Sequence, residues 1–340
     1  MTGAVEVTIR WRDDRIETVR VATHRPRLAP LLAGRSAEEA ATLIETLHAI
    51  CRRAQGAAAR AALHAARARP EAADRPAAAV DPAVRAEAAA ELVIAALADD
   101  APAQLAATHR AAHEPPALAR LLERELLGEP IDRWLAITHP TGLSDWAART
   151  DAPLARAYRR RLARWEPATA PIATVPAVTA RDTLDRWPRI DAGFAAAPHD
   201  RGEPAETGPV ARLERRALIA ALAPRPLLQR WIARVTELAL HARDDPEFRC
   251  GTVSVHGAAG RGRAVVETAR GTLIHDVALE GGTVREYSIV APTEWNFHPD
   301  GPLRHWLVGA SARSRDLARD HARRAVAALD PCVECRFTVD

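Results

Sequence analysis

The chain closes on Asp330-Pro331-Cys332-Val333-Glu334-Cys335, with five residues after the last cysteine. The preceding residues, 315–329, have apolar side chains at helical spacing, and Pro331 is expected to end that helix. Two cysteines separated by two residues hold their thiols near each other, as in metal sites and redox dithiols. Buried, inert cysteines can share this spacing, so metal binding, redox chemistry and simple packing all stay open at this point.

Cys51 is the third cysteine of interest, in the segment His48-Ala-Ile-Cys51. Ser36 and Glu39 form a capping box that predicts the start of a helix. The apolar spacing predicts that this helix continues through Cys51 toward Ala68, so His48 and Cys51 would share one face. His48 is therefore a candidate fourth ligand, although a lone histidine on an apolar segment is more often a hydrogen-bonded core residue. The remaining cysteine, Cys250, is expected to be structural.

The rest of the pattern predicts an α+β protein, mainly helical. Central helices are expected to carry an N-terminal β-hairpin and C-terminal β-strands packed outside them. Alternating residues over 5–11 and 16–22 predict the hairpin. We expect three regions: 1–165 with the hairpin and helices, a Pro-rich irregular connection over 166–209, and 210–340 with helices, strands and the final helix. Helices are predicted over 83–98, 103–112, 116–127, 153–164, 210–222 and 226–243, and strands over 252–256, 264–269, 272–279 and 283–290.

Composition excludes several classes of protein. All 47 basic residues are arginine, yet they alternate with 44 acidic residues, and aromatic residues make up 4% of the chain. A nucleic-acid interface would need clustered cations and stacking aromatics, so no nucleic-acid partner is expected. No apolar run reaches the roughly 18 residues of a membrane span, and no signal peptide is recognised at the N-terminus. Four cysteines are too few for a secreted disulfide framework, and we expect a cytoplasmic protein without a membrane partner.

Four segments together resemble the [NiFe]-hydrogenase large subunit. Residues 330–335 are similar to its C-terminal D-P-C-x-x-C motif, and Leu47–Cys51 stands where the family has an N-terminal C-x-x-C. Glu267–His275 resembles the E-A-P-R-G-x-x-x-H segment, and Val290–Asn296 resembles the V-P-[ST]-T-W-N segment. The segments occur in the family's order. The resemblance therefore implies a reduced form of the large-subunit fold.

The departures from this family bear on function. The first N-terminal cysteine position holds His48, and the histidines expected after each cysteine pair are replaced by Gln55 and Thr338. The R-x-E-G-H segment before the first strand is missing, and the tail that hydrogenase precursors lose after the cysteine pair is not present. A catalytic enzyme is not expected. The remaining pattern resembles the HupK/HoxV-type hydrogenase expression/formation proteins.

That resemblance implies a scaffold for hydrogenase maturation, with no catalytic residue of its own. Such a protein would carry an Fe(CN)2(CO) unit transiently on Cys51, Cys332 and Cys335, with His48 as a further metal ligand. Thiolates are soft ligands suited to low-spin iron(II). The implied partners are HypC/HypD-type maturation proteins, which supply the unit, and the hydrogenase large-subunit precursor, which receives it. A site with one thiolate fewer should hold iron, bind nickel poorly and release its cargo.

By position, Arg270, Pro292 and Thr293 would form the pocket for the diatomic ligands. In the family, the matching arginine lies beside these ligands, and the residue after the matching proline donates to a cyanide. Arg270 and Thr293 would therefore donate to cyanide nitrogens, and charge-assisted donors are the stronger kind. The competing interpretation of Arg270-Gly271 is a turn with a surface arginine.

Two alternative functions use the same cysteines. In the first, His48, Cys51, Cys332 and Cys335 form a structural Cys3His zinc site that joins the two ends of the chain. In the second, Cys332 and Cys335 act as a thiol oxidoreductase. Redox pairs usually lie at a helix N-terminus, where the helix dipole lowers the thiol pKa. Here the pair follows a helix, which disfavours the second alternative.

Overall fold

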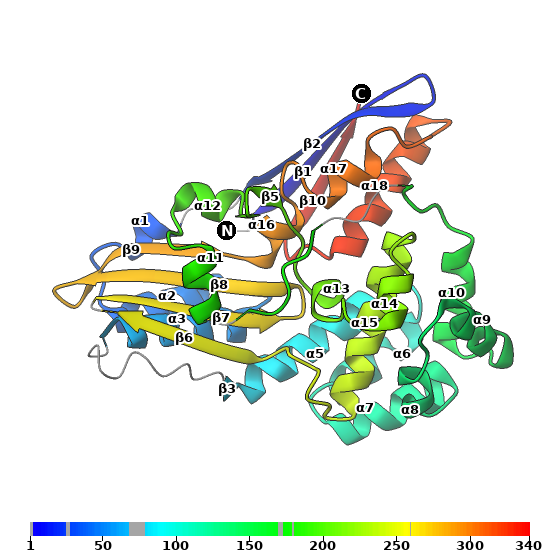
Figure 1. Cartoon of the computed structure of the whole chain (residues 1–340), viewed down its shortest axis with the longest axis horizontal. Helices are drawn as coiled ribbons and strands as arrows, with labels where there is room; N and C mark the ends of the chain where they lie inside the picture. Colours follow the sequence, from blue (N-terminus) through cyan, green and yellow to red (C-terminus); the bar gives the residue numbers. More distant parts are fainter. Residues whose placement is uncertain (1–2, 25–27, 68–78, 169–172, 179, 259) are drawn as a thin grey trace.

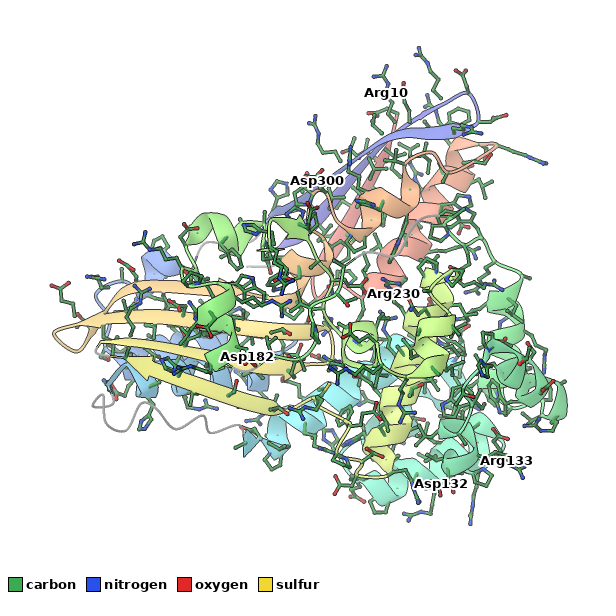
Figure 2. The ribbon with its side chains drawn as sticks, in the orientation of Figure 1. Arg10, Asp132, Arg133, Asp182, Arg230 and Asp300 are labelled. Carbon is green, nitrogen blue, oxygen red and sulfur yellow. The ribbon has the colours of Figure 1, made fainter. Side chains whose placement is uncertain are left out.

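The computed structural model describes residues 3–24, 28–67, 79–168, 173–178, 180–258 and 260–340. Figure 1 shows three parts: a sheet covered by helices, a body of helices beside it, and a smaller sheet that includes both chain ends. Charged side chains such as Arg10, Asp132 and Asp182 spread over all three parts (Figure 2). No helix in the described ranges combines the length and apolar character that a bilayer crossing requires.

The smaller sheet joins the two ends of the chain. β1 (Ala4–Arg12) and β2 (Arg15–His24) form the predicted antiparallel hairpin. β10 (Glu334–Val339) pairs in parallel with β1, and Cys335 lies opposite Val5. β10 was not expected from the sequence pattern. The apolar face of this sheet packs against α17 (Pro302–Leu307) and α18 (Arg315–Leu329), which follow α16 (Pro292–Asn296).

The larger sheet has the order β3-β6-β7-β8-β9, and the strands from β6 onward form an antiparallel meander. The strands are β3 (Ala79–Val80), β6 (Thr252–Ala258), β7 (Arg261–Thr268), β8 (Gly271–Glu280) and β9 (Thr283–Val290). The prediction that these strands pack on the outside is wrong for β7 and β8. They are buried along most of their length because both faces of the sheet are covered.

One face of this sheet is covered by α2 (Ala37–Leu47) and α3 (Arg52–Arg67). α3 is rich in alanine, so its backbone approaches the strands closely. A Cβ on Gly262 would lie 2.0 Å from the carbonyl oxygen of Ala62, and this strand position therefore requires glycine.

The predicted single helix from Ser36 toward Ala68 is wrong. The Ser36–Glu39 capping box starts α2 as expected, but α2 ends at Leu47 and α3 begins at Arg52. The carboxylate of Glu87 accepts hydrogen bonds from the backbone N–H groups of Arg53 and Ala54, at 2.8 and 2.9 Å. A distant side chain thus satisfies the first turn of α3 and stabilises a new helix start there. Ala68 lies outside the described residues.

The Pro-rich connection covers the other face of the sheet. It was expected to be irregular, but its described residues include α11 (Ala180–Arg186), α12 (Ala192–Ala196) and the short strands β4 (His199–Asp200) and β5 (Glu203–Pro204). Trp187 and Ile190 pack with Trp295 against the strands. The prolines limit the length of regular structure but do not prevent burial.

The helical body surrounds α15 (Pro226–Ala242), which is buried along its whole length. Trp134, Trp146 and Trp231 contribute the largest side chains of this core. Its predicted helices over 83–98, 103–112, 153–164 and 226–243 are confirmed, whereas 116–127 ends in a π-helical turn and 210–222 forms two short helices. The other elements are α5 (Pro82–Leu97), α6 (Pro102–Ala111), α7 (Pro115–Leu121), η1 (Leu122–Leu127), α8 (Ile131–Leu135), α9 (Pro140–Arg149), α10 (Pro153–Leu162), α13 (Pro209–Arg212) and α14 (Ala217–Ala221), with the four-residue α1 (Ala29–Leu32) near the N-terminus.

Candidate functional site

Cys332 lies in the short loop between α18 and β10. Asp330 ends α18 with a positive φ of 50°, which turns the chain out of the helix. The Cys332 Sγ is 3.1 Å from the Oγ1 of Thr293, the second residue of α16. The sequence pattern placed these two residues in one site, and the structure brings them together. Pro292, at the first position of α16, is buried beside Thr293 and sets the start of that helix.

Arg270 reaches the same region from the turn between β7 and β8. Its Nε donates to the backbone oxygen of Asp330 at 2.9 Å and lies 3.2 Å from the Asp330 carboxylate. Its Nη1 donates to Glu91 of α5 at 2.7 Å. Burial alone would lower the pKa of Arg270, but Asp330, Glu91 and the neighbouring thiols of Cys332 and Cys51 raise it above its usual value. The interpretation of Arg270 as a surface residue is therefore wrong.

Cys51 lies between α2 and α3, at the start of α3. It packs with Ala291 and residues of β7 and β8. The thiols of Cys51 and Cys332 both contribute, after Asp330 and Glu91, to raising the pKa of Arg270. The Nε2 of Gln55 donates to the Cys51 Sγ at 3.8 Å. Cys51 thus belongs to the same electrostatic environment as Cys332.

Cys335 is the third cysteine of the predicted ligand set. It is half-buried on β10, and its side chain packs against the cluster formed by the hairpin and α18. Burial, with a further contribution from Cys332, raises the pKa of Cys335 to about 11. In this conformation the described residues contain no group of three His, Cys, Asp or Glu side chains arranged to hold a metal ion. A site shared by Cys51, Cys332 and Cys335 therefore stays a prediction.

His48 does not share a helix face with Cys51, and that prediction is wrong because the helix breaks between them. His48 instead caps the C-terminus of α2, and its Nδ1 lies 2.8 Å from the carbonyl oxygen of Ile44. That nitrogen donates, so Nε2 is the atom that could bind a metal. His48 is close enough to His275 to lower its pKa.

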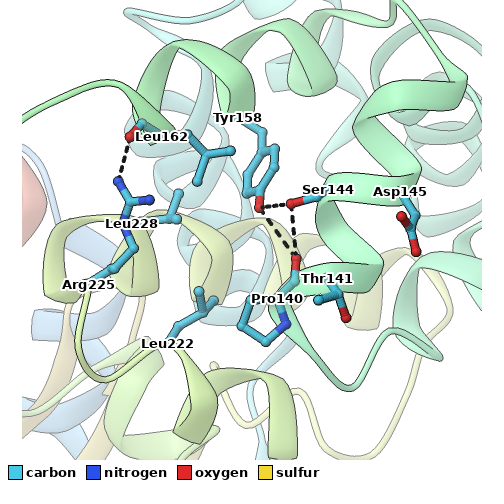
Figure 3. A pocket seen from close by; sticks show the side chains of 9 residues that line it. All are labelled: Pro140, Thr141, Ser144, Asp145, Tyr158, Leu162, Leu222, Arg225 and Leu228. Carbon is cyan, nitrogen blue, oxygen red and sulfur yellow. Dashed lines mark hydrogen bonds between the residues drawn. The ribbon is translucent and has the colours of Figure 1, made fainter.

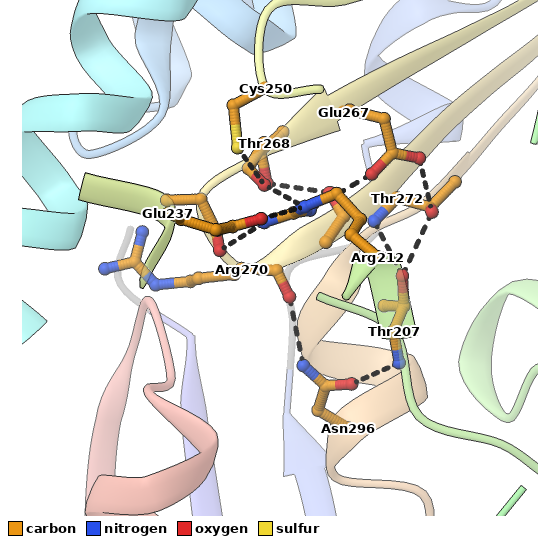
Figure 4. A network of polar contacts seen from close by, with 11 residues as sticks. Thr207, Arg212, Glu237, Cys250, Glu267, Thr268, Arg270, Thr272 and Asn296 are labelled. Carbon is orange, nitrogen blue, oxygen red and sulfur yellow. Dashed lines mark hydrogen bonds and ion pairs between the residues drawn. The ribbon is translucent and has the colours of Figure 1, made fainter. Parts of the chain in front are cut away.

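A buried ionic network fixes the turn that carries Arg270 (Figure 4). Arg212 donates to the carboxylates of Glu237 and Glu267 and to the backbone oxygens of Thr268 and Ala269. Asn296 donates to the next backbone oxygen, that of Arg270, at 3.2 Å. Three consecutive carbonyl groups are thereby held. The thiol of Cys250 lies in the same network and is fully buried, as expected for a structural cysteine.

Sequence reasoning missed Glu91 and the role of Asp330. Glu91 is buried, its Oε1 has no hydrogen-bond partner among the described residues, and burial raises its pKa to about 7 despite Arg270 nearby. A glutamate in an alanine-rich helix gives no local signal of this role. Asp330 was noted as part of the motif, but its contact with a turn 60 residues earlier could not be read from spacing.

A cavity of about 300 Å³ lies elsewhere in the molecule. It is bounded by α9, α10 and the loop before α15 (Figure 3). Tyr158 and Ser144 share a hydrogen bond at its wall, and Leu222 and Leu228 form its apolar side. None of the four cysteines lines it.

The arrangement of sheet, helical body and terminal loop defines the class of protein. Solved [NiFe]-type hydrogenases have the same fold. The [NiFeSe] hydrogenase G491S variant from Desulfovibrio vulgaris Hildenborough matches with a TM-score of 0.58 at 16% identity, covering 95% of this chain and 94% of that chain. An NAD+-reducing [NiFe]-hydrogenase matches with a TM-score of 0.55 at 16% identity, covering 94% and 93%. A family model described as nickel-dependent hydrogenase matches residues 210–337.

Closer relatives share the whole chain. The hydrogenase expression/formation protein HoxV of Cupriavidus necator is 32% identical, over 100% of this chain and 97% of its own length. HupK of Azotobacter vinelandii, a hydrogenase expression/formation protein as well, is 30% identical over 98% and 97%. The chain therefore belongs to the HoxV/HupK family of hydrogenase expression/formation proteins.

Proposed function

We propose that this chain is a non-catalytic hydrogenase maturation protein that carries an Fe(CN)2(CO) unit as cargo. Cys51, Cys332 and Cys335 would supply the thiolates. The observation that carries the proposal is the contact of the Cys332 thiol with the Thr293 hydroxyl, together with the bonds from Arg270 to Asp330, two residues before Cys332. A soft thiol, a hydroxyl donor and a cation from three separate segments support this assignment.

This donor set fits the chemistry of the cargo. Low-spin iron(II) with carbonyl and cyanide ligands favours thiolates. The cyanide nitrogens carry partial negative charge and accept hydrogen bonds from a guanidinium or a hydroxyl. Arg270 is bonded to Asp330, two residues before Cys332, and Thr293 contacts Cys332 directly. Loading would require Cys335 or the loop of Cys332 to shift, since the thiols are not gathered for coordination in this conformation.

The incomplete ligand set supports transfer rather than catalysis. His48 stands in place of one cysteine of the hydrogenase motif and caps the end of α2, whereas Cys51 precedes α3, so at most three thiolates are offered. Iron with three strong diatomic ligands needs few protein ligands, whereas nickel would lack its thiolate environment. We place the protein between HypC/HypD-type maturation proteins, as donors of the unit, and the large-subunit precursor, as its acceptor.

The test is infrared spectroscopy on protein purified without oxygen from a cell that makes hydrogenase. Carbonyl and cyanide bands are expected for the wild type, and Cys332→Ala should lose them and abolish hydrogenase maturation. Cys250→Ser is the matched control: it keeps a donor for the Thr268 carbonyl and should retain both bands and maturation.

Two outcomes would overturn the proposal. One is full maturation with unchanged bands in Cys332→Ala. The other is stoichiometric zinc without iron or carbonyl bands in the native protein, which would establish the structural zinc site instead. The thiol oxidoreductase alternative is not supported by geometry, because Cys332 precedes a strand, Cys335 lies within it, and burial raises the pKa of Cys335.

A further inference from the structure

A line of hydrogen bonds leads from the core of the larger sheet to the Cys51 sulfur. The hydroxyl of Tyr287 on β9 lies 2.8 Å from His275 Nδ1 on β8. His275 Nε2 lies 2.9 Å from the Oε1 of Gln55 on α3, and Gln55 Nε2 lies 3.8 Å from the Cys51 Sγ. His275 is fully buried, and the exposed fractions of Gln55 and Tyr287 are 1% and 5%.

The hydrogen positions along this line follow from the chemistry of its members. Among the described residues, the acceptor within reach of the Tyr287 hydroxyl is His275 Nδ1, so that nitrogen carries no proton. The proton of the neutral ring is then on Nε2, which donates to the Gln55 carbonyl oxygen. The Gln55 amide therefore turns its NH2 group toward Cys51. Burial, with His48 nearby, lowers the pKa of His275 to about 3, which agrees with a neutral ring.

We infer that Tyr287, His275 and Gln55 are positioning residues that present a fixed N–H donor to the Cys51 sulfur. The inference rests on the proposed function, in which Cys51 is a cargo ligand, and it names the groups that prepare that ligand. All three donors point the same way, so each bond polarises the next toward the sulfur. A hydrogen bond to sulfur favours the thiolate, which is the form that binds a metal.

Tyr287 does not contact Cys51, but it controls the orientation of the Gln55 amide through His275. A hydroxyl can donate or accept, but a buried hydroxyl that accepted from His275 would leave its own proton without a partner. Tyr287 thus selects the tautomer of His275, and the tautomer selects the orientation of the Gln55 amide. In the Tyr287→Phe variant, the proton of the neutral His275 ring could lie on Nδ1. The Gln55 amide could then turn its oxygen toward Cys51.

The test measures the alkylation rate of each cysteine by iodoacetamide in the metal-free, full-length chain at neutral pH, resolved by mass spectrometry. Loss of one hydrogen bond changes the thiolate fraction about fivefold. The opposing change in intrinsic nucleophilicity leaves about a two- to threefold fall in rate. We expect this fall at Cys51 in Gln55→Leu and a smaller fall in Tyr287→Phe, with the Cys332 rate unchanged in both.

Two control variants match these substitutions. Gln104→Leu and Tyr158→Phe make the same chemical changes in the helical body, where Tyr158 hydrogen-bonds Ser144, and both should leave the Cys51 rate unchanged. If Gln55→Leu does not fold, Tyr287→Phe decides, because it removes one oxygen atom that does not touch Cys51. An unchanged Cys51 rate in a folded Tyr287→Phe protein would overturn the inference. A rise in the alkylation rates of both Cys51 and Cys332 would also overturn the inference, because it would indicate only that the packing had loosened.

The iron-loaded protein gives a second, separate readout. Without the N–H donor, the sulfur donates more charge to iron, and the carbonyl band should move to lower frequency in Gln55→Leu. A native protein without any carbonyl band would remove the proposed function but leave the alkylation result standing. The two ideas can therefore fail independently.

Discussion

Arg270 joins two segments of the protein through its bonds to Asp330 and Glu91. The same side chain is also a candidate hydrogen-bond donor to the cyanide ligands of the proposed cargo. Its Nε and Nη1 are bound to Asp330 and Glu91, so its charge is balanced inside the protein without any cargo. Glu91 keeps one buried oxygen without a partner among the described residues, which carries a free-energy cost. The arginine is therefore held close to the thiols by contacts that local sequence could not reveal.

His275 gives a prediction for the pH dependence of stability. In the folded protein its pKa is lowered to about 3, first by burial and then by His48, whereas the ordinary value is 6.5. Between these values the unfolded chain binds a proton that the folded chain does not. The stabilisation is complete above pH 6.5 and is lost as the pH falls toward 3.

The measurement is urea unfolding at several pH values between 4 and 7. Wild type should lose up to about 1.4 kcal/mol of unfolding free energy per pH unit through this one group. His275→Gln should have a flatter profile over that range. A slope for His275→Gln equal to that of the wild type would contradict the assignment.

At the scale of elements, the contact between α3 and β7 depends on the missing side chain of Gly262. A Cβ there would lie 2.0 Å from the Ala62 oxygen and 2.6 Å from the Ala66 nitrogen, which are backbone atoms that cannot rotate away. Gly262→Ala is expected to lower the unfolding free energy by about 2–3 kcal/mol, measured by urea denaturation. In Gly193→Ala the nearest atom would be 3.3 Å away, and the change should stay within about 0.5 kcal/mol. Equal unfolding free energies of the two variants would contradict this prediction, because they would show that α3 can move away from β7 to make room for the Cβ.

The elements that were predicted well from the sequence are those whose formation depends on residues close together in the chain. α15 has apolar residues at regular helical spacing, and the hairpin alternates clearly, so both were predictable. The break between α2 and α3 was not, because the segment contains no glycine or proline and the new helix start depends on Glu87, more than 30 residues away. The alternation of Cys335, Phe337 and Val339 is typical of a strand, but this short stretch overlaps the cysteine motif and was not assigned as one.

The candidate site was predictable in part for a similar reason. Cys332, Thr293 and Arg270 were found through motifs, and the structure bonds Thr293 to Cys332 and Arg270 to Asp330, two residues before Cys332. Gln55 was noted as a departure from the family, yet its bonds to Cys51 and His275 depend on how α3 lies on the sheet. Contacts between side chains far apart in sequence are decided by packing, which a single sequence does not contain.

At the scale of the whole molecule, the terminal sheet is expected to open as a unit. Phe337 on β10 packs against the hairpin and α18. Phe337→Ala removes part of that apolar contact, at a cost of roughly 1–2 kcal/mol. Hydrogen exchange should become faster in β1, β10 and the Cys332 loop but not in β6–β9. Thr338→Ala, at an exposed position of the same strand, should exchange like the wild type, and uniform acceleration over both sheets in Phe337→Ala would contradict separate opening.

The parallel pairing of β1 with β10 sets an order of events during synthesis. β1 is made before the other described elements, and its partner strand β10 is made after all of them. The sheet that contains both strands can therefore close only after β10 has left the exit tunnel of the ribosome. Until then Cys335 cannot take its place opposite Val5, and the proposed thiolate set is not assembled.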